Sequence, residues 1–225
     1  METGPSESLS DAVIRKLERM MIAEPTTRQP WAAVFDIDET LLLNLPNDAV
    51  KQNPATIKVV QWLRDHNVKL FAVTARSFTE ASRHYALEQL RAVGHTDYDE
   101  ESIFLTFSNY EPYSRSWFKY QARKRIVAQG YHLLLNAGDN FSDLFVLKEH
   151  DPDVLVDVDE IDGHHLLDGV DLSVLENKYA NKSKQYLFEM DIRWPQSSGH
   201  VQTKLRKYYT SRLSWKLPNS EYTVK

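Results

Sequence analysis

The chain has 225 residues, of which 42% are hydrophobic and 26% are charged, which is ordinary for a globular protein. The formal net charge of -5 argues against a general nucleic-acid binder, although a local basic patch stays open. The chain contains no cysteine, so any metal must be bound by oxygen or imidazole ligands. The polar N-terminus does not resemble a signal peptide, and no apolar stretch approaches the roughly 20 residues of a membrane span. We therefore expect a cytoplasmic protein.

The first 145 residues alternate between helical and strand-like patterns. Apolar periodicity predicts helices over residues 10–23, 54–66, 79–93 and 117–129. Short runs rich in β-forming residues predict strands over 32–35, 68–73, 103–107 and 132–136. Ser10 or Asp11 is a candidate N-cap for the first helix, and Gly94 is a candidate C-cap for the third. This alternation predicts an α/β fold with a parallel sheet and helices on both faces.

The segments between and after these elements are less regular. Residues 44–53 and 109–116 are predicted to be loops. Residues 151–171 are strongly acidic, and we expect a solvated surface there, because the spacing does not fit an EF-hand loop. A helix is predicted over 172–190. From His200 the chain turns basic with interleaved aromatic residues, which suits either a groove for a nucleic acid or nucleotide or the outer face of a helix.

Polar residues follow three of the predicted strands. Asp36 and Asp38 come directly after the first strand, Thr74 after the second and Asp139 after the fourth. In open parallel sheets, ligands bind outside the carboxyl ends of the strands, so these residues are expected to converge. Carboxylates as close as Asp36 and Asp38 repel each other unless a cation or a proton offsets the charge. A lone Asp-x-Asp is also common in a surface turn, so the whole set of strand ends decides the interpretation.

Such a set of residues suits the cleavage of a phosphate monoester. Asp36 can attack phosphorus and form an aspartyl-phosphate, and Asp38 can protonate the leaving alcohol and later deprotonate water. Asp36 and Asp139 offer the oxygen ligands that Mg²⁺ prefers, and Asp143 can bind the metal directly or through a water molecule. Thr74 can bind phosphate oxygens with its hydroxyl and a neighbouring amide. A lysine is expected nearby to offset the carboxylates and hold the phosphoryl group.

These residues resemble the four motifs of the haloacid-dehalogenase-like (HAD) phosphohydrolases. The similarity is closest to the branch of class C acid phosphatases and plant vegetative storage proteins, subfamily IIIB. The motifs in this chain are Asp36-x-Asp38-x-Thr40, Thr74-Ala-Arg76, Lys119-x-x-x-Arg123, Gly130-Tyr131 and Gly138-Asp139-x-x-x-Asp143. The register favours Lys119 as the motif lysine, with Lys124 as the runner-up. The resemblance implies a Rossmann-like sheet and a Mg²⁺-dependent phosphatase.

The resemblance also implies roles for residues that the strand pattern leaves open. Thr40 and Lys119 are implied to bind phosphate, and Asp38 is implied to bind the metal through its backbone carbonyl. Arg76 either contacts the substrate or pairs with a carboxylate of the first motif. Residues 212–219 resemble the closing strand of that branch.

Four regions follow: an N-terminal helix and connector, a phosphatase core, an insert, and a closing strand with a tail (residues 1–30, 31–145, 146–211 and 212–225). We expect the N-terminal helix and the insert to build a small accessory lobe over the site.

The predicted activity is an acid phosphatase or nucleotidase acting on a small organic phosphate, with a nucleotide among the candidates. Two alternatives stay open. One is a polynucleotide 3′-phosphatase, which the basic tail favours and the net charge opposes. The other is a catalytically silent storage or binding relative, against which the retained Asp36 argues. The expected partner is a small phosphate ester, with no membrane partner, and the pattern indicates no oligomeric state.

Overall fold

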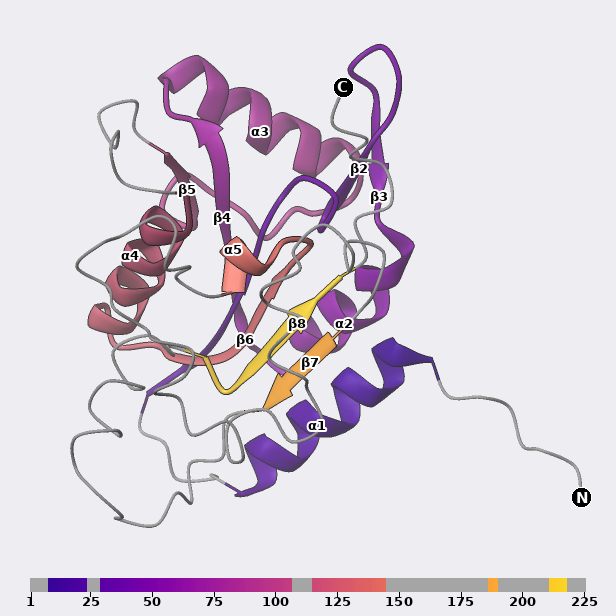
Figure 1. The fold of residues 1–225 in the computed structure, drawn as a ribbon, viewed down its shortest axis with the longest axis vertical. Helices are drawn as coiled ribbons and strands as arrows, with labels where there is room; N and C mark the ends of the chain where they lie inside the picture. The colour runs from indigo at the N-terminus through magenta and orange to yellow at the C-terminus, as the bar shows by residue number, and fades with distance from the viewer. Residues whose placement is uncertain (1–7, 24–28, 107–114, 145–185, 190–210, 218–225) are drawn as a thin grey trace, which may run out of the picture.

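A six-stranded sheet forms the centre of the computed structural model, which describes residues 8–23, 29–106, 115–144, 186–189 and 211–217 (Figure 1). The strand order is β5-β4-β1-β6-β8-β7. All neighbouring pairs are parallel except β7 and β8, which are antiparallel. The strands are β1 (Trp31–Phe35), β4 (Lys69–Ser77), β5 (Ile103–Thr106), β6 (His132–Gly138), β7 (Tyr186–Glu189) and β8 (Leu213–Lys216). The predicted α/β fold with a parallel sheet is confirmed.

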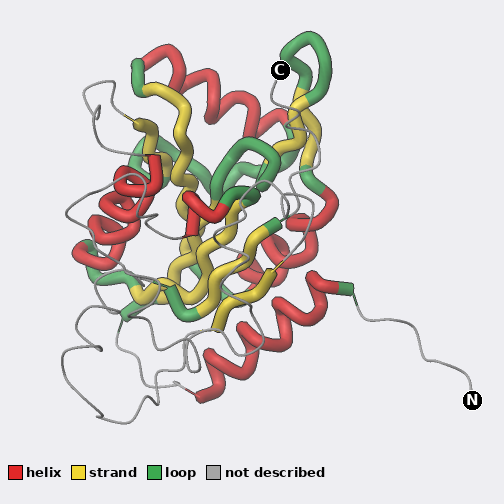
Figure 2. Tube along the Cα trace, viewed as in Figure 1, coloured by secondary structure: helices red, strands yellow, loops and turns green. Residues whose placement is uncertain are grey.

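Helices cover both faces of this sheet (Figure 2). They are α1 (Leu9–Ala23), α2 (Pro54–Asp65), α3 (Glu80–Ala92), α4 (Arg115–Ala128) and the short α5 (Phe141–Leu144). Alternate residues of β1 enter different cores, since Ala33 and Phe35 pack with α1, α2 and α3, whereas Ala32 and Val34 pack with α4. A strand buried on both faces therefore ends between two helical layers, and its last residues are fixed from both sides.

The helix ends have identifiable causes. Ser8 caps α1 by accepting a hydrogen bond from the Asp11 amide with its hydroxyl, so the predicted caps Ser10 and Asp11 lay two and three residues too late. Thr79 caps α3 in a capping box with Ser82. Gly94 follows α3 with a φ of 91°, a left-handed conformation that favours glycine, as the predicted C-cap requires.

The structure corrects several predicted boundaries. Residues 44–53 are not only a loop, because Leu42–Asn44 (β2) and Val50–Gln52 (β3) form an antiparallel hairpin. Strand β4 does not stop at Thr74 but continues to Ser77. Helix α4 starts at Arg115, inside the predicted loop 109–116. The two strand errors share a cause, since polar residues were taken as the end of a strand although pairing with a neighbouring strand continues it.

The C-terminal part of the chain is described only at two strands. Residues 186–189 form β7 rather than the end of the predicted helix 172–190. Because β7 extends the main sheet beyond β8, this part of region 146–211 belongs to the sheet. The acidic segment 151–171 and residues 200–210 of the basic segment lie outside the described residues, so the accessory lobe stays a prediction. The later residues of the basic segment, from 211 to 217, lie in and around β8 rather than on a helix. The predicted closing strand is present as β8, parallel to β6.

Helix α1 packs against α2 and contributes to the main core through Val13, Leu17 and Met20. Helix α1 is thus part of the core packing, and its predicted share in an accessory lobe stays a prediction. None of the helices in the described ranges is both long and apolar enough to span a bilayer.

Candidate active site

The candidate site lies at the carboxyl ends of β1 and β6, which are neighbours in the sheet. Asp36 directly follows β1, and its amide donates to the Ala137 carbonyl of β6 at 2.9 Å. Asp139 directly follows β6. The parallel pairing of two buried strands thus brings both carboxylates to one edge, and both residues are buried.

Lys119 of α4 is the buried cation among these carboxylates. Its Nζ lies 2.8 Å from Oδ1 of Asp36 and donates to Oδ1 of Asp143 at 2.6 Å, and only 3% of the residue is exposed. Burial opposes the charged ammonium, but the charges of Asp143 and Asp36 outweigh it and raise the pKa of Lys119. Lys124 is exposed and lies over the Tyr120 ring instead. The geometry therefore distinguishes the two lysines in favour of Lys119.

A separate set of contacts holds Asp143 in place. The Asn140 amide donates to its Oδ2 at 2.8 Å, while Arg123 and Asn136 donate to its backbone carbonyl at 2.5 and 3.1 Å. Burial lowers the pKa of Arg123 to about 10, with the guanidinium still protonated at neutral pH. A Cβ at Gly138 would lie 2.3 Å from the Cβ of Asp143, so only glycine fits where β6 passes under this turn.

Asp36, Asp139 and Asp143 can present three carboxylate oxygens that lie within 4.8 Å of one another. All three side chains are buried, and burial raises the pKa of both Asp36 and Asp139. Lys119 opposes this rise, while Asp143 adds to it. One lysine charge does not offset three buried carboxylates, and hard oxygen donors are the ligands of divalent cations such as Mg²⁺. The donor set therefore fits a divalent metal.

Asp38 occupies a different environment from Asp36. Its side chain is 26% exposed, and Arg76 of β4 donates to both carboxylate oxygens, from Nη2 to Oδ1 at 2.7 Å and from Nε to Oδ2 at 2.9 Å. Asn44 adds a third hydrogen bond to Oδ1 at 3.1 Å. Burial works toward a higher pKa, but the hydrogen bonds and charge of Arg76 outweigh it and lower the pKa of Asp38. Of the two predicted roles of Arg76, the structure contains the carboxylate pairing.

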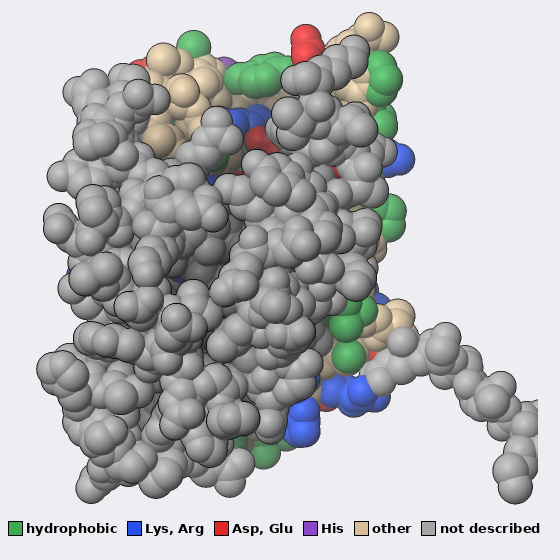
Figure 3. All heavy atoms as spheres, viewed as in Figure 1, with side chains coloured by type: hydrophobic (Ala, Val, Ile, Leu, Met, Phe, Trp, Pro, Cys, Tyr) green, Lys and Arg blue, Asp and Glu red, His purple; other side chains and the backbone are tan. Residues whose placement is uncertain are grey.

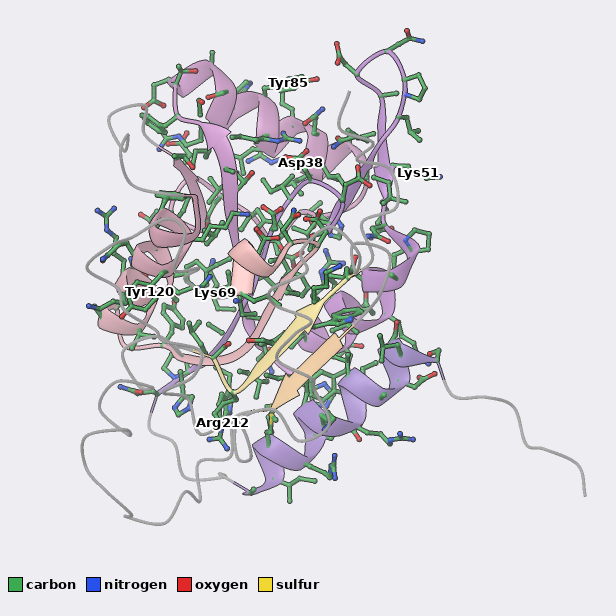
Figure 4. The ribbon with its side chains drawn as sticks, viewed as in Figure 1. Asp38, Lys51, Lys69, Tyr85, Tyr120 and Arg212 are labelled. Atoms are coloured by element: carbon green, nitrogen blue, oxygen red, sulfur yellow. The ribbon has the colours of Figure 1, made fainter. Side chains whose placement is uncertain are left out.

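This pair lies at the more open side of the site. The side chains of Arg76 and Asp38 are 20% and 26% exposed, against 4% and 7% for Lys119 and Asp36. Figure 3 shows Lys or Arg atoms beside Asp or Glu atoms on this face of the molecule, and Figure 4 labels Asp38 below α3. The neighbouring Thr40 and Thr74 are both buried. The hydroxyl of Thr74 accepts the Arg76 amide at 3.2 Å, and the hydroxyl of Thr40 has no hydrogen-bond partner among the described residues.

Three polar residues of the site region were missed from the sequence. Asn136 is a buried amide inside an otherwise apolar strand, which was an available signal. Asn44 donates a hydrogen bond to Asp38, and Gln89 accepts one from Arg76. Sequence spacing does not predict either contact, because each one joins different elements of the fold.

A parallel sheet with a lysine-bridged carboxylate cluster at its carboxyl edge defines an α/β protein with a phosphoryl- or metal-binding type of site. The family model of the HAD superfamily, subfamily IIIB (acid phosphatase), matches residues 47–225, and the chain belongs to this family. The resemblance drawn from the sequence is thereby confirmed. The matched range includes Thr74, Lys119 and Asp139 but begins after Asp36 and Asp38.

The chain also matches individual proteins over part of its length. The chain is similar to "Acid phosphatase 1" of Solanum lycopersicum, with 27% identity over 139 residues, and it spans about half of that protein's length (52%). A class C acid phosphatase structure from Bacillus anthracis matches with a TM-score of 0.47 and 18% identity, over 63% of this chain and 66% of that one. A second structure of that enzyme, with tungstate bound, matches with a TM-score of 0.43 and 17% identity, over 62% and 66%.

Proposed function

We propose that this protein is a Mg²⁺-dependent phosphomonoesterase that cleaves a small phosphate ester through an aspartyl-phosphate on Asp36. The observation that carries the proposal is the buried Nζ of Lys119, 2.8 Å from Asp36 and 2.6 Å from Asp143, beside the third carboxylate, Asp139. Membership of the acid phosphatase family supports the same reaction class.

The metal site would be formed by Asp36, Asp139 and Asp143, with the backbone carbonyl of Asp38 as a further oxygen donor. Bound Mg²⁺ would supply positive charge that offsets the carboxylates and the phosphoryl oxygens. Lys119 supplies the protein's own share of that charge, because its pKa is raised by its carboxylate neighbours and it stays protonated.

In the first step, Asp36 attacks phosphorus. A bond forms between a carboxylate oxygen of Asp36 and phosphorus, and the ester P–O bond breaks. Lys119 and Thr74 hold the phosphoryl oxygens during this exchange. The leaving oxygen takes its proton from Asp38, which is the more exposed of the two carboxylates.

In the second step, a water molecule attacks the aspartyl-phosphate. Asp38 accepts the proton of this water, phosphate leaves, and Asp36 is regenerated as a carboxylate. The ionised state that Arg76 favours suits Asp38 for this role. A bound phosphate ester brings negative charge close to Asp38, and a like charge favours the protonated carboxyl that the first step needs.

The proposed substrate is a small organic phosphate, with nucleotides among the candidates. Of the aromatic and basic residues after His200 that suggested a base-binding surface, those before residue 211 lie outside the described residues, and Arg212, Trp215 and Lys216 are buried at β8. The family alone therefore supports the small-ester class. The cytoplasmic location likewise stays a prediction.

The proposal is tested by replacing the nucleophile. We expect Asp36→Asn to lower turnover of phosphate esters in Mg²⁺ by more than about a thousandfold, because the amide cannot form the acyl phosphate intermediate. Far-UV circular dichroism checks that the fold is retained. Asp48→Asn is the matched control, since Asp48 is exposed and its left-handed φ of 58° is tolerated by asparagine.

A substrate panel with and without Mg²⁺ completes the test. It includes mononucleotides and a 3′-phosphorylated oligonucleotide at two salt concentrations, because binding to a polynucleotide weakens steeply with salt. Full activity of Asp36→Asn, or the same activity with a chelator, would contradict the proposal.

A further inference from the structure

We propose that Gln89 of α3 is a positioning residue that acts through Arg76 to orient the carboxylate of Asp38 toward the leaving group. The inference rests on the proposed function, because Asp38, whose orientation it explains, is the general acid of that reaction. It concerns three side chains from three separate parts of the chain, the loop after β1, strand β4 and helix α3.

The guanidinium of Arg76 is held from two sides. Its Nε and Nη2 donate to the two oxygens of Asp38, and its Nη1 donates to Oε1 of Gln89 at 2.6 Å. A guanidinium is planar and rigid, so a partner on Nη1 fixes the plane in which the other two nitrogens point. Rotation of Asp38 about its own side-chain bonds is restricted in the same way. The orientation of Asp38 therefore depends on a residue that does not touch it.

Gln89 is itself fixed by its own helix. Its Nε2 donates to the hydroxyl of Tyr85 at 3.0 Å, one helical turn earlier on α3. The guanidinium of Arg76 can only donate, so the acceptor end of the amide faces Arg76 and the donor end is left to face Tyr85. Figure 4 labels Tyr85 on α3 and Asp38 below that helix. The chain of hydrogen bonds thus runs from a surface tyrosine to the proposed acid.

The position of Asp38 matters most for substrates whose leaving group is a strong base. An alkoxide needs its proton during bond cleavage, whereas p-nitrophenolate leaves without one. A displacement of about 1 Å at a reacting group can cost about a hundredfold in rate. Loss of orientation at Asp38 is therefore expected to slow alkyl phosphates much more than p-nitrophenyl phosphate.

The kinetic test compares the two esters in Gln89→Met, which keeps the side-chain length and helix propensity but removes the acceptor. We expect kcat/KM for an alkyl phosphate to fall about tenfold and that for p-nitrophenyl phosphate to change less than about twofold. Gln89→Glu keeps an acceptor for Nη1 and is expected to restore most of the alkyl activity. Glu88→Gln is the matched control, since Glu88 is its exposed neighbour on α3 and pairs with His84.

A second measurement does not depend on turnover. In ¹⁵N-arginine-labelled protein, the Nε–H of Arg76 is expected to exchange with water about tenfold faster in Gln89→Met than in wild type, with Gln89→Glu close to wild type. Unchanged exchange, or equal or smaller losses on the alkyl ester than on the aryl ester, would overturn the inference. A wild-type protein that hydrolyses neither ester would instead contradict the proposed function.

Discussion

Asp36 and Asp38 are the same residue type two positions apart, yet their surroundings shift their pKa values in opposite directions. The Asp36 side chain is 7% exposed, and burial raises its pKa despite the adjacent Lys119. Asp38 is 26% exposed, and the two-pronged contact with Arg76 lowers its pKa despite partial burial. The difference follows from the partners of each carboxylate, since Arg76 and Asn44 give Asp38 three hydrogen bonds. Asp36, in contrast, is more deeply buried and shares Lys119 with Asp143.

The two environments also divide the chemistry. Asp36 shares its lysine with Asp143 and lies beside Asp139, so its carboxylate stays ionised only with a further cation. Asp38 receives two hydrogen bonds from Arg76 and one from the neutral Asn44, so its charge is satisfied without a metal. The proposed reaction needs both kinds of carboxylate. Asp36 is the nucleophile and requires the metal to stay ionised, whereas Asp38 is the acid–base group and does not.

The largest expected effect comes from removing the cation of the buried cluster. Lys119→Met leaves Asp36 and Asp143 buried without their shared partner, which typically costs about 3–5 kcal/mol. Urea unfolding in the presence of chelator measures this loss. Lys124→Met is the matched control on the same helix and is expected to stay within about 0.5 kcal/mol of wild type, because Lys124 is exposed. Equal effects of the two substitutions would remove the distinction between the lysines.

The sequence predicted this cluster because its members occupy strand ends. Asp36 and Asp139 each follow an apolar run, and the carboxyl ends of parallel strands meet at one edge. Lys119 could not be placed by pattern, since its helix position resembles that of Lys124, and the family register was needed to choose it. The contact between Arg76 and Gln89 was out of reach, because it depends on how α3 packs over β4 rather than on local spacing.

The fold shows the same contrast between features that local sequence patterns detect and features that they miss. Strands buried on both faces, such as β1 and β6, give apolar runs that sequence patterns detect. The β2–β3 hairpin was missed although its turn contains Asn47 and Asp48, two residue types that favour turns. Both adopt left-handed φ values, of 61° and 58°. Strand β7 was missed because its four residues lie within the longer stretch 172–190 that was predicted to be helical. Four residues are too few for periodicity to distinguish a strand from a helix.

The second prediction uses the raised pKa of Asp139 in metal-free protein. Where its folded pKa lies above the unfolded value, the folded state binds the extra proton, so stability falls as pH rises between the two. Asp139→Asn removes this penalty. In chelator, the variant is expected to gain about 2 kcal/mol on wild type between about pH 5 and about pH 7.

The control for this pH dependence is the metal itself. Saturating Mg²⁺ is expected to keep the cluster ionised in the folded wild type and so to abolish the gain of Asp139→Asn. Urea unfolding at the two pH values, with and without Mg²⁺, measures both quantities. A constant difference between variant and wild type in chelator would mean that Asp139 is already ionised in the metal-free fold.

The smallest expected effect concerns the other carboxylate and has the opposite sign. Lysine cannot donate to both oxygens of Asp38 as Arg76 does, so Arg76→Lys is expected to cost about 1 kcal/mol near neutral pH. Because the folded pKa of Asp38 is lowered, this contribution is fully present above the unfolded pKa and disappears as pH falls through the folded one. The difference between variant and wild type in urea unfolding should therefore shrink below about pH 4, the range in which unfolded aspartates titrate. A cost that is independent of pH would mean that Arg76 contributes by packing, and the contrast between Asp36 and Asp38 would then rest on burial alone.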